Sequence, residues 1–257
     1  MRAPVLLCFL LAALAAVANQ SVRHFHARDG TTRPAAPRFL RADSVANDVR
    51  ADLAVPVSGH GDTLIRLWKG RGQLDTGRIS VVLSRPRQRS QRTFRLRRVG
   101  NSYRRAIPFA PAVPWKLLVR VTLAGRVKTL AFLVYFGPGG RRLALPLFAP
   151  IGAGTQVASL PVGDMVADLR VVVGASGDSR IFLVFRPAHV HLPSHLRLAV
   201  TMMSMVMGTQ YVSAERGPHS DYSARPFFSM PGIWRIQVQA GTLSRAAALV
   251  VGNPSSI

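Results

Sequence analysis

The sequence predicts an all-β protein, built from two tandem immunoglobulin-like β-sandwiches that follow an N-terminal signal peptide. Two observations predict this fold. Short runs rich in Val, Leu, Ile and Phe are separated by turn signals such as Gly59-His60-Gly61-Asp62 and Val99-Gly100-Asn101, without a helical period. The second half of the chain also repeats the first half in the same order.

The N-terminus has the pattern of a secretory signal peptide. Arg2 supplies a positive charge, residues 5–17 are apolar, and Ala16-Val17-Ala18 forms a cleavage signal before Asn19. The apolar run is shorter than the ~20 residues of a comfortable membrane span. We therefore expect residues 1–18 to be removed and the protein to be periplasmic or secreted, with an uncleaved anchor as the alternative. The mature chain would have no thiol, because Cys8 is the only cysteine.

The internal repeat predicts the domain boundaries. Residues 48–53 recur as residues 164–169, and two aromatic pairs follow in the same order. These pairs are Tyr103 with Tyr222 and Trp115 with Trp234. Each repeat has roughly the ~100 residues of an immunoglobulin-like sandwich, and we expect the tryptophans to fill the cores. The prediction is an irregular arm at 19–44, a first repeat at 45–137, a linker at 138–162 and a second repeat at 163–253.

The net charge of the chain is +23, and arginine supplies almost all of the basic charge. In an exported protein this charge favours an anionic envelope partner or surface, such as lipid head groups, polysaccharide phosphates or an acidic protein, over nucleic acid. High arginine with little lysine is also typical of a compositional bias in the genome, and this alternative stays open.

The repeats diverge most between their matched Asp and Tyr residues. In the first repeat this region carries a series of arginines, here called the arginine strip: Arg85, Arg87, Arg89, Arg92, Arg95, Arg97 and Arg98. Such a strip is either a solvated sheet edge that resists edge pairing or an anion-binding surface. The candidate anion- or partner-binding residues are Arg85, Arg87, Arg89 and Arg92.

The second repeat has methionines in the same region. Alternation along residues 196–202 predicts a strand in which Met202 points inward, and its continuation would point Met203, Met205 and Met207 outward. Thioether sulfur is a soft ligand that suits Cu(I), and imidazole also binds copper. The alternative is that these methionines are adaptable packing. The candidate metal ligands are Met203, Met205, Met207, Met230 and His219.

One stretch of the second repeat resembles a known family. The pattern Met203-x-Met205-x-Met207-Gly208, the Asp221-Tyr222 turn and the run Met230-Pro231-Gly232-Ile233-Trp234 resemble YtkA-like and FixH-like domains. The resemblance covers residues 164–252, and the first repeat is similar only through its Tyr and Trp. It implies a small exported bacterial β-sandwich linked to copper handling and to the assembly of haem-copper oxidases. It also implicates Met203, Met205, Met207 and Met230 in copper binding.

The sequence does not favour an enzyme. Acidic residues number only 11, and no phosphate-binding glycine loop opens a helix. Two functions remain. The first is an exported YtkA-like protein that binds or delivers copper through the methionines, and the second is a non-enzymatic envelope interaction module that uses a basic, arginine-rich face. No later segment is apolar enough to predict an integral membrane protein.

Overall fold

The structure is a computed structural model. It describes residues 38–74, 77–85, 90–110, 113–136, 142–152, 154–174, 178–187, 195–203, 205, 207–217 and 221–252. The predicted signal peptide, the predicted arm up to residue 37, Arg87, Arg89 and His219 lie outside these residues. Residues from Arg38 onward form one compact unit.

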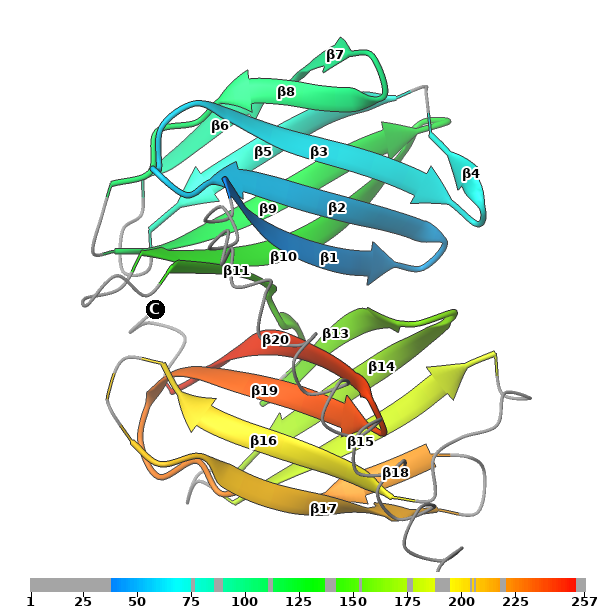
Figure 1. Ribbon diagram of the computed structural model, residues 1–257, viewed down its shortest axis with the longest axis vertical. Helices are drawn as coiled ribbons and strands as arrows, with labels where there is room; N and C mark the ends of the chain where they lie inside the picture. Colours follow the sequence, from blue (N-terminus) through cyan, green and yellow to red (C-terminus); the bar gives the residue numbers. More distant parts are fainter. Residues whose placement is uncertain are drawn as a thin grey trace, which may run out of the picture. The chain divides into compact units, whose positions relative to one another are not determined.

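The described residues contain strands and no helix, so the all-β prediction is confirmed (Figure 1). Consistently, the described part of the chain has no helix of the length and apolarity needed to cross a bilayer. The strands are β1 (Phe39–Ala46), β2 (Val49–Pro56), β3 (Asp62–Lys69), β4 (Gly72–Gln73), β5 (Arg78–Ser84), β6 (Gln91–Arg95), β7 (Arg97–Val99), β8 (Ser102–Ala106), β9 (Pro114–Leu123), β10 (Arg126–Phe136), β11 (Arg142–Pro146), β12 (Ala149–Gly152), β13 (Thr155–Val162), β14 (Met165–Val173), β15 (Ser179–Arg186), β16 (Leu196–Met202), β17 (Gln210–Arg216), β18 (Asp221–Ala224), β19 (Gly232–Ala240) and β20 (Leu243–Val251).

Strands β1 to β10, here called the first strand set, form two sheets. One sheet has the order β1-β2-β3-β8-β7, and the other has β10-β9-β5-β6 with β11 added at its β10 edge. Residues of both sheets share one buried cluster, as in a sandwich. Strand β9 shows how the sequence specifies this, because Trp115, Leu117 and Val119 are buried while the residues between them are not.

Strands β13 to β20, here called the second strand set, follow the strand order of the first set, in which β4 has no counterpart and β6 and β7 together correspond to β17. The orders β13-β14-β15-β18 and β20-β19-β16-β17 repeat those of the first set. Strand β17 pairs with β16 in one of these orders and with β18 in the other, so it connects the two. In the first set two strands share this role, because β6 pairs with β5 and β7 pairs with β8. A second buried cluster fills this set. The internal repeat therefore extends to strand order, while its immunoglobulin-like classification stays a prediction.

The segment 138–162, predicted as a linker, contains β11, β12 and β13. The second strand set therefore begins at Thr155, and β1 takes in part of the predicted arm. The prolines of this segment suggested a break in the strands. They are tolerated because Pro146 ends β11 and Pro150 lies in the edge strand β12, where a missing N–H costs little.

The segment between β11 and β12 joins the two sets. Leu147 donates a backbone hydrogen bond to the Ala131 carbonyl over 2.9 Å, and Phe148 donates one to the Ala248 carbonyl over 2.9 Å. These residues lie at a third apolar cluster, here called the joining cluster. Its buried members are Ala131, Leu133, Leu147 and Ala248, and its partly buried members are Leu118, Leu145, Met203, Ile233 and Val250.

The matched aspartates of the repeat lie on the exposed side of equivalent strands. Asp52 on β2 lies 3.4 Å from the Arg41 guanidinium and directly opposite Asp43. Asp168 on β14 pairs with Arg186 and lies opposite Ser159, which donates a hydrogen bond to it. Burial raises the pKa of Asp52, and the Asp43 carboxylate raises it further, against the opposite effect of Arg41.

This raised pKa predicts that Asp52→Asn stabilises the protein at neutral pH. There the carboxyl is ionised in both folded and unfolded chains, and the folded environment disfavours that charge. We expect a gain of ~0.2–1 kcal/mol, the range for opposed cross-strand charges. The gain should disappear below pH 3.8, where the carboxyl is protonated in both states. Chemical denaturation at pH 7 and pH 3 measures it.

The matched control is Asp48→Asn. Asp48 lies 3.5 Å from Lys69 and 3.9 Å from Lys128, so its loss should bring no gain in stability. A gain from both substitutions at pH 7 would contradict the proposed role of the Asp43–Asp52 repulsion.

Candidate functional site

The same tryptophan anchor closes one end of each strand set. The Trp115 indole donates a hydrogen bond to the Ala110 carbonyl over 3.1 Å, and the Trp234 indole donates one to the Met230 carbonyl over 3.1 Å. Each ring also meets a phenylalanine edge to face, namely Phe109 or Phe228. Both tryptophans are buried, as the sequence predicts. The shared aromatic residues are therefore scaffold.

The residue that faces this tryptophan differs between the sets. In the second set, Met202 is the cross-strand partner of Trp234 and is buried. In the first set, Arg85 follows the last residue of β5, and its guanidinium lies 4.5 Å from the centre of the Trp115 ring. Arg85 and Met202 therefore occupy equivalent places. The regions where the repeats diverge begin at the same point of the fold.

The methionines after β16 differ in exposure. Strand β16 ends at Met202, and Met203 bonds through its N–H to the Ile233 carbonyl over 2.8 Å. The Met203 side chain points away from the core that holds Met202 and is partly buried in the joining cluster. Met205 and Met207 are exposed, at 48% and 38%. Met203 thus has the expected outward direction but packs against apolar neighbours, whereas Met205 and Met207 are accessible.

Met230 packs elsewhere. Its carbonyl accepts the Trp234 hydrogen bond, and its side chain packs against the buried cluster of the second set. Met203 and Met230 thus contact different apolar clusters. Among the described residues, no group of three or more His, Cys, Asp or Glu side chains could hold a metal ion. Of the predicted ligands that the structure describes, Met205 and Met207 have the accessible thioethers.

Four arginines of the arginine strip lie on two edge strands, namely Arg92, Arg95, Arg97 and Arg98. Strand β6 is the outer strand of one sheet, and β7 is the outer strand of the other. Arg92 lies opposite Leu83, and Arg95 lies opposite Ser80, so these two arginines project from opposite faces of β6. Both are exposed. These arginines therefore lie at the edges of both sheets of the first strand set.

Two arginines face each other across β7 and β8. Arg97 is the cross-strand partner of Arg104, whose Nε also donates a hydrogen bond to the Ser102 hydroxyl over 3.1 Å. Like charges in this position destabilise a sheet. This pairing has a cost unless a counter-charge lies nearby.

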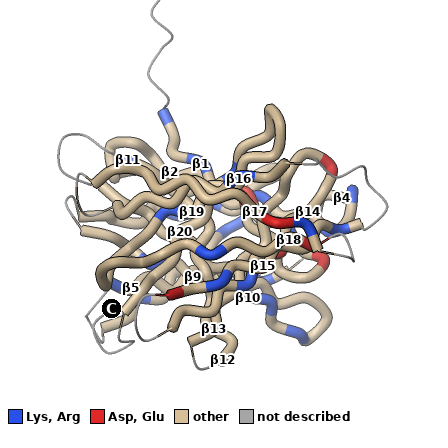
Figure 2. The backbone as a smooth tube through the Cα atoms, turned by 90° about the horizontal axis from the view of Figure 1, so that it is seen from below, with Lys and Arg blue, Asp and Glu red and all other residues tan. Residues whose placement is uncertain are grey.

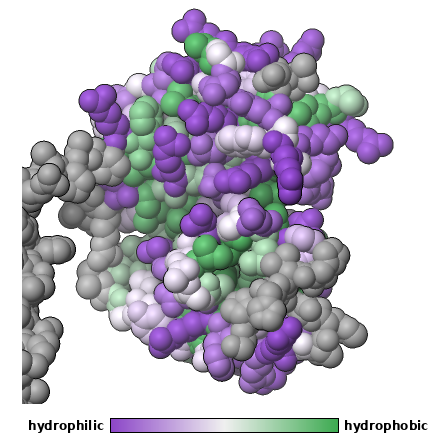
Figure 3. All heavy atoms as spheres, turned by 45° about the vertical axis from the view of Figure 1, so that its right-hand side comes forward, coloured by the Kyte–Doolittle hydropathy of each residue, from purple (hydrophilic) through white to green (hydrophobic). Residues whose placement is uncertain are grey.

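Acidic residues are scarce around the strip. From Arg85 to Arg105 the sequence has nine arginines and no Asp or Glu. Among the described residues, the ion pairs use Asp43, Asp48, Asp52 and Asp168, and none includes Arg92, Arg95, Arg97, Arg104 or Arg105. Basic positions outnumber acidic ones along the described chain (Figure 2), and hydrophilic side chains cover much of the visible face of the first set (Figure 3).

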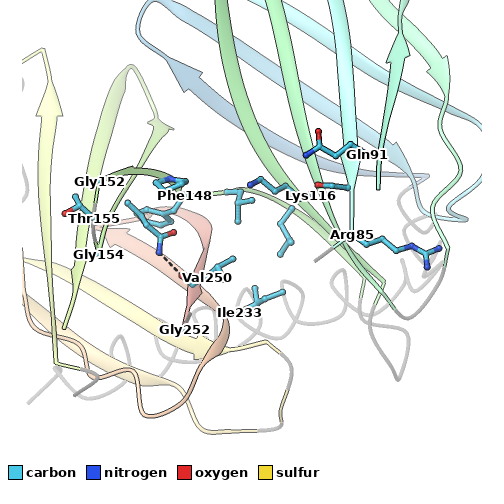
Figure 4. Close-up of a pocket in the computed structure, with 15 residues that line it drawn as sticks. Arg85, Gln91, Lys116, Phe148, Gly152, Gly154, Thr155, Ile233, Val250 and Gly252 are labelled. Atoms are coloured by element: carbon cyan, nitrogen blue, oxygen red, sulfur yellow. Dashed lines mark hydrogen bonds between the residues drawn. The ribbon is translucent and has the colours of Figure 1, made fainter. Parts of the chain in front are cut away.

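The structure also reveals a cavity that the sequence analysis did not predict. It has a volume of about 370 Å³ and lies beside the joining cluster (Figure 4). Lys116, on the outward side of β9, and Arg85 line it together with residues of both strand sets. Alternation around Trp115 could have placed Lys116 outward. That Lys116 lines one cavity with Pro150, Gly152 and Gly154 depends on contacts distant in sequence, which no local pattern shows.

Comparison with known proteins adds no match: no family model and no curated protein matches this chain. The argument for function therefore rests on the side chains described above. The resemblance of the second repeat to YtkA-like and FixH-like domains stays a prediction.

The stacking of Arg85 on Trp115 predicts a measurable contribution to stability. We expect Arg85→Gln to lower the free energy of unfolding by about 0.5–1 kcal/mol, the range for a partly exposed cation–π contact. Arg92→Gln is the matched control, because Arg92 is exposed on an edge strand, and it should change stability by less than ~0.5 kcal/mol. Equal losses in a urea denaturation series would contradict a specific role for the stack.

Proposed function

We propose that this chain is an exported, non-enzymatic interaction protein that binds an anionic envelope partner or surface through the arginine strip. The observation that carries the proposal is the run of nine arginines without an acidic residue, six of which lie on β6, β7 and β8. An anionic surface would supply the negative charge that the sequence leaves out of this region.

The geometry favours binding by side chains. Guanidinium groups bind phosphate or carboxylate in a bidentate manner, and one anion can bridge two of them. Such an anion would offset the repulsion between Arg97 and Arg104. The arginines on both faces of β6 oppose the addition of a partner strand. We therefore favour a polyanionic surface over an extended peptide that joins the sheet.

The proposal includes the predicted context of the protein. The signal at residues 1–18 would deliver it to the periplasm or the exterior, and two immunoglobulin-like sandwiches would hold the strip on a rigid scaffold. No catalytic step is part of this function.

Vesicle binding tests the strip. We expect the protein to cosediment with vesicles that contain phosphatidylglycerol more than with phosphatidylcholine vesicles, and less so as salt rises. The double variant Arg95→Glu/Arg97→Glu should weaken this binding at least tenfold, since each basic residue near an anionic surface contributes ~1 kcal/mol.

The control for this test changes net charge equally at other exposed sites. Arg126 begins β10 and Arg170 lies on β14, and both are exposed. Arg126→Glu/Arg170→Glu should weaken binding less than threefold. An equal loss in both double variants would show that net charge alone governs binding and would overturn the role of the strip.

Copper binding is the second candidate function, and the exposure of Met205 and Met207 favours it. Two thioethers on one short segment suit a soft ion such as Cu(I). Met203 and Met230, which the sequence also implicates, could join them only through a different arrangement of this region, since they pack in separate clusters. His219, the remaining predicted ligand, lies outside the described residues.

A Cu(I) competition titration tests this candidate. Met205→Leu/Met207→Leu should lower the affinity for Cu(I) at least tenfold, whereas Met203→Leu, at the partly buried position, should keep it. Wild-type affinity in the double variant would contradict the candidate. The Arg95→Glu/Arg97→Glu variant should bind Cu(I) normally, so the two functions fail separately.

A further inference from the structure

The cavity beside the joining cluster is lined by apolar and by polar residues. The apolar residues include Leu133, Leu147, Phe148, Ile233 and Val250. The polar residues are Ser84, Arg85, Gln91, Lys116, Thr155 and Gln156, of which Gln91 and Lys116 lie on one side of Phe148 and Thr155 on the other (Figure 4). The cavity volume of about 370 Å³ lies within the roughly 300–1,000 Å³ of small-molecule sites.

The charge of the lining has one sign. Arg85 and Lys116 are its only ionisable residues among those described, and neither takes part in an ion pair between described residues. The Arg85 guanidinium lies on Trp115, a core residue of the first set, and points away from the cavity (Figure 4), so Lys116 supplies the charge that faces the cavity. Lys116 is half-buried. A half-buried ammonium without an acidic partner favours an anionic group, because such a group would offset its partial loss of hydration.

The apolar lining is accessible because the hairpin formed by β12 and β13 has glycines, rather than larger residues, where it borders the cavity. Gly152 and Gly154, at the turn between β12 and β13, line the cavity together with Gly252. A Cβ placed on Gly152 would meet no atom within 4 Å, so there is open space at this position. Gln156, which donates a hydrogen bond to the Val250 carbonyl over 2.7 Å, fixes this hairpin against β20 (Figure 4).

We propose that this cavity binds an anionic amphiphile, a molecule with one acidic head group on an aliphatic chain. The head group lies against Lys116, and the chain lies against Leu133, Ile233 and Val250. A small inorganic anion would leave the apolar surface wet, and a neutral lipid would leave the Lys116 ammonium without a counter-charge. This site does not depend on the arginine strip, because Arg85, the strip residue in its lining, directs its guanidinium toward Trp115.

Calorimetric titration of the full exported chain tests the site. The probes are decanoate, decyl phosphate and decanol, each below its micelle concentration. We expect one molecule of at least one of the two anions to bind, at least tenfold more tightly than decanol. Carboxylate and phosphate are compared directly, and the tighter of the two identifies the class of head group. Either preference supports the proposal.

Two variants locate the binding. Lys116→Gln removes a charge but keeps a polar side chain, and it should weaken binding of the anion about tenfold, as for a hydrogen bond to a charged group, without affecting decanol. Gly152→Leu places a side chain in the open space and should abolish binding of all three probes. Gly152 lies outside the left-handed region of φ, and the new side chain has room, so a normal melting temperature is expected.

Arg95→Gln, on the strip and outside the cavity lining, is the matched control and should bind like the wild type. Equal affinity for decanol and both anions would overturn the proposal. Unchanged binding in Lys116→Gln would overturn it too, and that test remains if Gly152→Leu does not fold. Loss of vesicle binding without loss of decanoate or decyl phosphate binding would separate the strip from the cavity.

Discussion

The two strand sets are joined by an apolar contact on faces that would ordinarily be polar. An antiparallel sheet with one face on a core usually exposes polar residues on the other. Here β9, β10, β19 and β20 carry apolar residues on their outward faces, and these form the joining cluster. Alanine at positions 131 and 248 lets the chain at Leu147 and Phe148 approach both sheets closely enough to bond with their carbonyls. The cavity exists because this cover ends at glycines 152 and 154.

The two sets cover their equivalent tryptophans with different side chains. Each must cover the tryptophan that is anchored to the carbonyl of a preceding loop. Met202 covers Trp234 by burial, and Arg85 covers Trp115 by stacking. The Met202 thioether is uncharged, whereas the Arg85 guanidinium keeps its charge beside the ring. A single change in what covers the ring therefore places a positive charge next to the tryptophan in the first set only.

Much of the fold could be predicted from local patterns. Alternation predicted β9 and β16, and the repeat predicted that equivalent strands would recur in order. The passage of the chain from β6 in one sheet to β7 in the other could not be predicted. It occurs at Leu96, whose backbone N–H donates a hydrogen bond to the carbonyl of Ile79, a residue distant in sequence. The partial burial of Met203 could not be predicted either, because the cluster that covers it on the outward face contains residues distant in sequence.

The charge arrangement is more informative than the charge total. A compositional bias would account for the number of arginines, yet it would not distinguish one strand from another. Around β1 and β2, arginines stand beside aspartates, as Arg50 does at 3.0 Å from Asp43. On β7 and β8 an arginine stands opposite an arginine instead. Since opposed like charges cost stability, the second arrangement needs a counter-charge that the described residues do not supply. That physical requirement, rather than the value of +23, is why the arginine strip is the part of this surface best suited to an anionic partner.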